Sequence, residues 1–359
     1  MASPVGPRRI IKDTQRGGRA SRRVAVLALA IATSTAMSAC GNSDGSKDSA
    51  GASTSLQIAV SGHPIDTLSV PYISGMDAGC FKKEGIEISK ISGSGGGGDT
   101  VRNVLSGDLP FGDVSPVAAI QAFQSGSPVV IVGGGAQAIS TVKYIAEKDS
   151  PLTSIDDLPG NTVAFTSPGS VTEAVLRLSL SRAGVDINDI KTRAAGGIGE
   201  GLTALTGGGV DAAAMVEPTL SSLPDDYKVL WSASDYIKDF QKSVIISSKD
   251  YVAKNPKAVK NFLAGRACGV KTLTDDTAKA AELWGKELRI EPNLVEPVLK
   301  ESISAGEFGV GLSVEGLRTL EESMRQLGQL KVDEKVDWDT LIDQDYLPEG
   351  TATIDPSKL

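Results

Sequence analysis

Short apolar runs alternate along this chain with longer segments whose apolar residues recur at helical spacing. The runs predict buried strands, and the longer segments predict helices packed against them. In the first part of the chain the predicted strands are 56–60, 85–91, 110–113 and 128–132, and the predicted helices are 70–83, 99–107 and 115–125. Strands that alternate with helices at this spacing favour a parallel sheet covered on both faces.

A second unit with the same alternation begins near Thr141. Its predicted strands are 144–146, 162–165, 190–194 and 212–216, after which 228–231 and 244–247 carry the chain back toward the first unit. Further helices are predicted at 199–205, from 256 onward, and at 278–287, 293–305 and 314–327. We therefore expect a first lobe built from 56–140 and 243–347, a second lobe from 141–242, and a loose tail at 348–359.

The stretch 163–178 joins a predicted buried strand directly to a predicted helix. The residues at this junction are hydroxyls, a glycine and the first helical positions: Thr166, Gly169, Ser170, Val171 and Thr172. The first N–H groups of a helix have no partner within the helix and lie at the positive end of its dipole. The junction is therefore a candidate site for an oxyanion. An ordinary capped helix start is the alternative interpretation.

Glu217 is a second candidate binding group. A strand of small residues, 212–216, ends at this carboxylate, and Pro218 follows it. Open α/β sheets bind ligands at the carboxyl ends of their strands. Glu217 is therefore expected to face the gap between the units and to hold a hydroxyl, an amine or the hinge. A solvated acid before a loop is the alternative.

The glycine-rich segment 93–98 matches the spacing of a dinucleotide-binding loop, but the helix after it is short and no acidic ribose partner follows. We interpret it as a loop whose backbone N–H groups approach a ligand, with a plain surface turn as the alternative. His63 is the only histidine, which excludes a paired-histidine zinc site and leaves one possible base for a serine nucleophile. The sequence thus predicts no metal, no cofactor and no catalysis.

The first 39 residues differ in composition from the rest. Seven of the 36 basic residues and one of the 44 acidic residues lie here, and a short apolar segment, 24–37, follows the charges. This order predicts a secretory signal peptide at 1–39. Residues 37–40 resemble a bacterial lipobox, so Cys40 would carry a lipid that holds the protein at a membrane without spanning it. The polar run 41–55 would then be a flexible tether.

The charge of the remaining chain excludes one class of partner. Without residues 1–39 the net charge falls from −8 to −14. Because no basic stripe interleaved with aromatic residues is present either, nucleic-acid binding is not expected.

Two cysteines, Cys80 and Cys268, remain besides the lipobox cysteine. They could pair in an oxidising compartment. Both lie in apolar helical patterns, however, so we favour two buried thiols over a disulfide.

Several short motifs, in their order and spacing, resemble one protein family. They are Ile58-Ala-Val60 with its turn, Lys83-Glu-Gly-Ile86, Gly107-Asp-Leu-Pro-Phe-Gly112, Thr166-Ser-Pro-Gly-Ser170 and Asp211-Ala-Ala-Ala-Met-Val-Glu-Pro218. From about residue 56 to residue 327 the chain resembles the solute-binding proteins of ABC importers for nitrate, sulfonate, taurine and thiamine-precursor pyrimidines. The resemblance implies an α/β periplasmic-binding-protein fold of type 2. Each of its two lobes would be a mixed, mainly parallel sheet flanked by helices, and a two-segment hinge would join them.

The resemblance also implies capture of a small-molecule ligand between the lobes by hinge closure, without catalysis. The residues that it places around the ligand are Ser61, Gly62, His63, Ser94, Gly95, Asp99, Ser115, Thr166, Gly169, Ser170, Val171, Thr172 and Glu217. The implied partners are an ABC permease and its ATPase in the membrane. The protein would be a monomer at the outer face of the cell membrane, anchored through lipidated Cys40.

The chemistry of the ligand stays open on the sequence. Hydroxyl and amide dipoles suit a small oxyanion such as a sulfonate, nitrate or a taurine-like solute. No Arg or Lys falls in the candidate segments, however, so a neutral or amine-bearing heterocycle paired with Glu217, such as a thiamine-precursor pyrimidine or a flavin, is the alternative. Two other classes are a lipid-anchored hydrolase that uses His63 and a serine, and a sensor subunit that presents its closed form to a membrane receptor.

Overall fold

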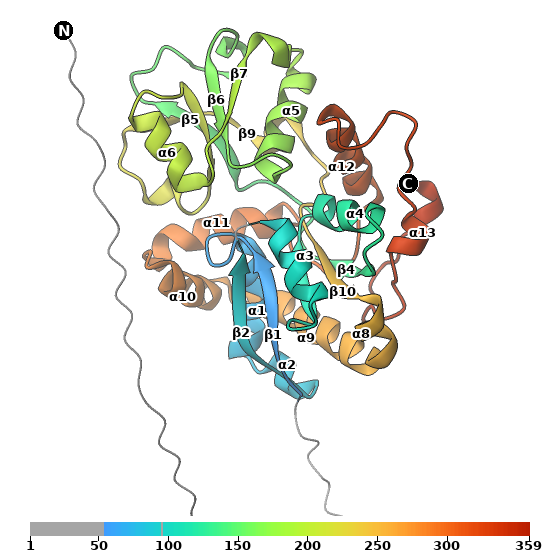
Figure 1. Ribbon diagram of the computed structural model, residues 1–359. Coiled ribbons are helices and arrows are strands. Elements are labelled where there is room, and N and C mark those ends of the chain that lie inside the picture. The colour runs from blue at the N-terminus through green and yellow to red at the C-terminus, as the bar shows by residue number, and fades with distance from the viewer. Residues whose placement is uncertain (1–53, 95) are drawn as a thin grey trace, which may run out of the picture. The chain divides into compact units, whose positions relative to one another are not determined.

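Two five-stranded sheets form the framework of the protein in a computed structural model that describes residues 54–94 and 96–359 (Figure 1). The strands of the first sheet are β1 Thr54–Ser61, β2 Ile86–Ser94, β3 Phe111–Val114, β4 Val129–Gly134 and β10 Val244–Ser248. Their order is β2-β1-β3-β10-β4. The strands of the second sheet are β5 Val142–Glu147, β6 Thr162–Phe165, β7 Lys191–Ala194, β8 Ala212–Val216 and β9 Tyr227–Ser232, in the order β7-β6-β8-β5-β9.

Each sheet is mainly parallel and contains one strand that runs against its neighbours. In the first sheet β1 pairs in parallel with β2 and β3, whereas β10 is antiparallel to β3 and β4. In the second sheet β6 pairs in parallel with β7 and β8, whereas β5 is antiparallel to β8 and β9. The expected mixed, mainly parallel α/β fold is therefore confirmed.

The first sheet is buried on both faces. One face packs against α1 (Val70–Asp77), α2 (Cys80–Lys83) and α9 (Pro256–Asp275), where the rings of Phe111 and Phe262 stack with centroids 4.0 Å apart. The other face packs against α3 (Gly97–Leu105) and α4 (Pro116–Gln124). Burial on both faces explains why β4 begins as a continuous apolar run, because a sheet covered on both faces has no solvated side to carry polar residues.

The second sheet is covered in the same way. Figure 1 shows α5 (Val171–Ala183) and α6 (Ile198–Thr206) on its two sides. Along β8 the side chains alternate between them: Ala213 belongs to the apolar cluster with α6, and Ala212 and Ala214 belong to the cluster with α5. Small residues in β8 let both helices approach the sheet closely.

The chain crosses between the sheets twice, through 135–141 and through 237–243, which we call the first and second crossing segments. They are bonded to each other, since Gly135 N donates to Ser243 O at 3.0 Å and Ser243 N donates to Ala136 O at 3.1 Å. The second crossing segment begins directly after the short helix α7 (Ala233–Tyr236).

The remaining helices follow β10. They are α8 Lys249–Lys254, α10 Thr277–Leu288, α11 Pro292–Ser304, α12 Val314–Gln326 and α13 Trp338–Leu341. Helix α12 contacts both α5 and α4, and its Leu317, Leu320 and Met324 are buried in one apolar cluster that extends over residues of both sheets. The apolar core is therefore continuous from one sheet to the other at α12.

Two sequence-based expectations about the first lobe are wrong in detail. The helix expected over 70–83 is broken into α1 and α2, because Gly79 adopts a left-handed conformation with φ 71°. The two expected thiols form a disulfide between Cys80 and Cys268, whose Cα atoms are 5.7 Å apart. The apolar helical pattern is real, but α2 and α9 pack directly on each other and bring the two cysteines together.

The segment after Pro348, expected to be loose, is bound to the body of the protein. The Gln344 side chain pairs with the backbone of Ile354 in both directions, at 2.8 and 2.9 Å, and Arg318 of α12 donates to Lys358 O. The expected signal peptide, Cys40 and most of the expected tether lie outside the described residues, as does Gly95. Within the described ranges no helix combines the length and apolar character needed to cross a membrane.

Candidate functional site

Hydroxyl groups meet at the carboxyl ends of β1 and β2. Ser61 Oγ lies 2.8 Å from Thr100 Oγ1, and Ser94 Oγ lies 2.6 Å from the same atom. Thr100 belongs to α3 and was not among the sequence candidates. Gly93 has no room for a side chain, because a Cβ there would lie 2.5 Å from His63 O. The glycine therefore lets the loop after β1 lie directly against the end of β2.

Ser115 stands at the carboxyl end of β3 and is the N-cap residue of α4. Its hydroxyl makes no capping hydrogen bond, and although the oxygen is buried it has no partner within the described part of the chain. A buried polar atom without a partner costs free energy. Ser115 is thus the candidate on the first sheet whose hydroxyl lacks a hydrogen-bond partner among the described residues.

The loop after β1 carries Gly62 and His63. Gly62 adopts φ 74°, a left-handed conformation that favours glycine. His63 Nδ1 lies 3.0 Å from Ser69 Oγ and 3.9 Å from Glu287 Oε2 on α10. Burial lowers the pKa of His63 below its usual value and raises the pKa of Glu287. The hydroxyl that contacts His63 belongs to Ser69, which is completely buried, so this contact holds the loop after β1 against the turn that follows it.

Asp99, expected beside the ligand, lies in the first turn of α3 and pairs with Arg102. Its side chain is 49% exposed. It does not join the hydroxyl chain of Ser61, Thr100 and Ser94. Its charge acts on the helix end and on Arg102 instead.

On the second sheet, the hydroxyl residues at the start of α5 bond to one another. Ser170 is the N-cap residue and accepts from Glu173 N at 3.2 Å, whereas Val171 begins the helix. Thr172 Oγ1 accepts from Thr166 N at 3.0 Å and lies 2.8 Å from Thr166 Oγ1. These side chains close the turn between β6 and α5, as the capped-helix interpretation expects.

The carboxylate of Glu173 lies at the start of α5, where an anionic ligand was expected to bind. Glu173 Oε2 accepts from Gly169 N at 2.8 Å, and its Oε1 accepts from Arg177 Nε at 3.2 Å. Glu173 is only 7% exposed, and the ion pair with Arg177, at 3.1 Å, compensates its buried charge. Gly169 itself, at φ 75°, must stay a glycine, since a Cβ would also lie 2.8 Å from Gln329 Nε2. The positive end of this helix is already neutralised.

Glu217 is buried at the carboxyl end of β8 and is fully engaged. Its Oε2 accepts from Ser221 N at 3.0 Å and from Ser221 Oγ at 2.7 Å. Its Oε1 lies 3.3 Å from Lys143 Nζ on β5, and the same Nζ lies 3.9 Å from Glu301 Oε2 on α11. Lys143 was missed on the sequence because it is 74 positions from Glu217 and becomes its neighbour only through β5–β8 pairing.

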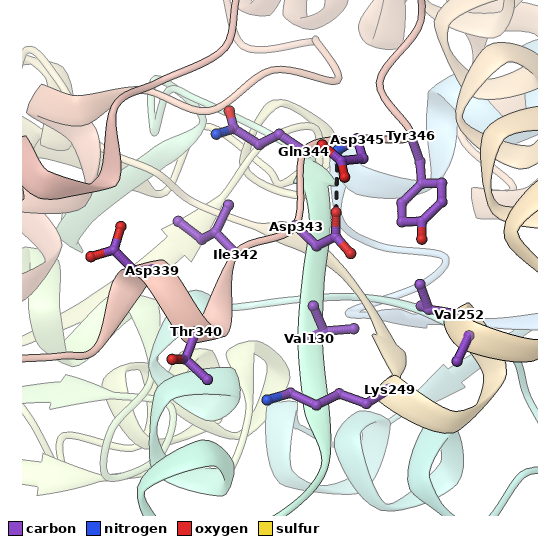
Figure 2. Close-up of a pocket in the computed structure, with 11 residues that line it drawn as sticks. Val130, Lys249, Val252, Asp339, Thr340, Ile342, Asp343, Gln344, Asp345 and Tyr346 are labelled. Atoms are coloured by element: carbon purple, nitrogen blue, oxygen red, sulfur yellow. Dashed lines mark hydrogen bonds between the residues drawn. The ribbon is translucent and has the colours of Figure 1, made fainter.

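A cavity of about 550 Å³ lies elsewhere, at the outer edge of the first sheet (Figure 2). Its lining includes Val130 of β4, Lys249 of α8, Asp343 and Tyr346. Val130 is near the amino end of β4, whereas the candidate residues follow the carboxyl ends of strands. This cavity and the candidate site are therefore on opposite ends of the sheet.

Solved structures similar to this chain share its architecture. The periplasmic aliphatic sulphonate binding protein SsuA from Escherichia coli is 19% identical, with a TM-score of 0.66 over 83% of this chain and 94% of that chain. The periplasmic nitrate-binding protein NrtA from Synechocystis PCC 6803 is 14% identical, with a TM-score of 0.65 over 82% and 87%. The CA3427 gene product of Candida albicans, described as having the generic periplasmic binding protein fold, is 14% identical, with a TM-score of 0.67 over 82% and 98%.

These likenesses show the two-lobe periplasmic-binding-protein fold that the sequence resemblance implied. Among curated proteins no match is found. A family model described as NMT1/THI5 like matches residues 67–280, more than half of the chain. The chain therefore belongs to the NMT1/THI5-like family.

Proposed function

We propose that the protein is the extracytoplasmic solute-binding component of an ABC importer and holds a small solute between its two sheets. The similar proteins SsuA and NrtA are named for the binding of aliphatic sulphonates and of nitrate. The observation that carries the proposal for this chain is the unpartnered hydroxyl of Ser115, next to strand ends that carry further hydroxyls. A ligand that bridges both sheets stabilises their closed arrangement.

The charges at the candidate site favour an uncharged polar solute. An oxyanion at the start of α5 would meet the buried carboxylate of Glu173, which already takes the N–H of Gly169. An amine at Glu217 would meet Lys143. An oxyanion would be repelled by Glu173 and an amine by Lys143, and both repulsions oppose binding. Hydroxyl, carbonyl or ring-nitrogen groups can bond to Ser115 without this repulsion, so we propose a neutral heterocycle of the aminopyrimidine kind.

A thermal-shift screen tests both the function and the ligand class, because a ligand that binds only the folded state raises its melting temperature. A hydroxymethyl-aminopyrimidine should raise it, whereas nitrate, ethanesulfonate and taurine should leave it unchanged. Glu173→Gln removes the blocking charge and should make ethanesulfonate bind roughly tenfold tighter. Glu200→Gln, at the start of α6 on the same sheet, is the matched control and should change nothing.

Two results would contradict this ligand class. One is a shift of the wild-type protein by ethanesulfonate or nitrate, and the other is an unchanged response of Glu173→Gln. If no compound of any class shifts the melting temperature, the solute-binding function itself is in question.

The membrane anchor and the partners complete the proposal. We propose that lipidated Cys40 tethers the protein beside an ABC permease and its ATPase, and that 141–242 moves as one lobe against the remainder. Cys40→Ala should transfer the protein from the membrane fraction to the supernatant of lysed cells, since a covalent lipid supplies the anchoring free energy. An unchanged membrane fraction would rule out this anchor.

A further inference from the structure

Lys242, in the second crossing segment, has a side chain that is only 3% exposed yet charged. Its Nζ donates to Asp66 Oδ1 at 2.8 Å, to Thr67 Oγ1 at 3.0 Å and to Glu307 Oε1 at 3.0 Å. Burial by itself lowers the pKa of Lys242, but the carboxylates of Asp66 and Glu307 raise it overall. A fourth contact, to Thr141 Oγ1, is 3.5 Å long. The ammonium group therefore connects the second crossing segment to three other parts of the chain, at 66–67, at Thr141 and at Glu307.

The contact with Asp66 reaches the candidate loop of the first sheet. Asp66 N donates to Gly62 O at 2.9 Å, and Asp66 Oδ1 accepts from Leu68 N at 3.3 Å to cap the turn that follows. Asp66 thus connects Lys242 to the loop that carries Ser61 and His63, through its carboxylate on one side and its backbone N–H on the other. Whatever moves Lys242 Nζ must move this loop or break its ion pair.

The contact with Thr141 reaches the candidate residues of the second sheet. Thr141 O accepts from Glu217 N at 2.9 Å. Thr141 immediately precedes β5, which places Lys143 beside the carboxylate of Glu217. A single residue therefore lies between the Lys242 ammonium group and the candidate groups of each sheet. This residue is Asp66 on the side of the first sheet and Thr141 on the side of the second.

We propose that Lys242 is a positioning residue that holds the 61–66 loop and the Thr141–Glu217 junction in one arrangement, so that a displacement of either is transmitted to the other. The ion pairs with Asp66 and Glu307 fix the ammonium group, and its 3.5 Å polar contact with Thr141 Oγ1 passes its position to the first crossing segment. The role of both ends in solute capture rests on the proposed function. The experiment below uses no solute, so its failure is distinguishable from a failure of that function.

Amide hydrogen exchange of the full chain with Asp66→Asn tests the transmission. Asparagine keeps the cap on Leu68 N but loses the ion pair with Lys242, while the pair between Lys242 and Glu307 remains and keeps the buried charge compensated. Exchange in the 62–68 loop should become roughly tenfold faster. Exchange of the Glu217 amide, which Asp66 does not touch, should become faster as well.

Thr141→Val provides the reciprocal test, since it removes the hydroxyl contact from the other end and should accelerate exchange in the 62–68 loop. Asp186→Asn is the matched control: Asp186 also caps a short 3₁₀ turn, by accepting from Asn188 N at 2.9 Å. It should accelerate exchange only beside its own turn. Faster exchange confined to the substituted side in Asp66→Asn and in Thr141→Val would overturn the proposal, because a purely local structural role predicts that result.

Discussion

Arg266→Met is expected to lower the free energy of unfolding by about 3–5 kcal/mol, because it leaves a buried carboxylate without its cation. Arg266 and Asp113 are almost completely inaccessible to solvent, with Arg266 Nη2 3.4 Å from Asp113 Oδ2 and 3.0 Å from Gly135 O. Arg266 Nε also donates to Tyr72 OH at 3.0 Å, and this hydroxyl donates to Asp113 Oδ2 at 3.0 Å. Removal of the guanidinium breaks all of its own contacts together, whereas the hydrogen bond from Tyr72 to Asp113 remains.

The loss of stability caused by Arg266→Met should become smaller as the pH is lowered. Burial raises the pKa of Asp113, while Arg266 and its other hydrogen-bond partners lower it. Without Arg266 the folded state of the variant binds the Asp113 proton more tightly than the unfolded state, so its stability rises as the pH falls through the raised folded-state pKa toward the lower unfolded-state pKa. The difference between wild type and Arg266→Met should therefore be smaller at about pH 5 than at about pH 8.

Urea unfolding at both pH values measures this prediction. Lys271→Met on the same helix is the matched control, because Lys271 pairs with Asp275 at the surface, with 76% of its side chain exposed. It should change the stability by no more than about 0.5 kcal/mol. An Arg266→Met loss as small as that of the control, or one independent of pH, would contradict the assignment of Arg266 as the compensating charge of Asp113.

Loss of the disulfide should destabilise the protein by a similar amount. Cys80 and Cys268 are separated by 188 positions, and a cross-link that closes so long a loop restricts the unfolded chain strongly. Loop-closure entropy predicts up to about 5 kcal/mol, and measured values for native disulfides fall at about 2–5 kcal/mol. The double variant Cys80→Ser/Cys268→Ser should therefore unfold at a clearly lower urea concentration.

Reduction of the wild-type protein is the control for that variant. Dithiothreitol should bring the wild-type transition down to that of the double variant and leave the variant unchanged. Titration of the unfolded, unreduced chain should find neither Cys80 nor Cys268 as a free thiol. Two free thiols, together with equal transitions in the presence and absence of dithiothreitol, would show that the cysteines are unpaired.

Strands were the most predictable part of the fold. The ranges 162–165 and 212–216 coincide with β6 and β8, because strands buried on both faces are short, unbroken apolar runs. Helix interruptions were harder to predict. The apolar spacing continues across Gly79, so the break between α1 and α2 depends on one left-handed residue rather than on a change of pattern. The short helix α7 rests on a capping box at Ser232 that is too local for periodicity to detect.

The candidate site was predictable only where a single strand end defines it. Ser61 and Ser94 are the last residues of their strands, and Ser115 and Glu217 come directly after theirs, as the rule for open sheets expects. The residues that pair with these candidates come from distant parts of the chain. No spacing rule in the sequence connects a candidate to its partner. Lys143 reaches Glu217 through strand pairing, and Thr100 reaches Ser61 from α3. Glu173 stands three residues after the N-cap residue Ser170, which is the spacing of a capping box, but its carboxylate accepts from Gly169 N.

Helix α12 limits the directions in which the two halves of the protein can separate. Its Leu317, Leu320 and Met324 lie in apolar contact with both halves, so separating the halves along this helix would expose that surface to water at about 25 cal/mol per Å². Rotation about an axis close to α12 exposes far less. We therefore expect the molecule to open on the side where Lys143 meets Glu301, where one long ion pair must break, and a solute to enter and leave through that side.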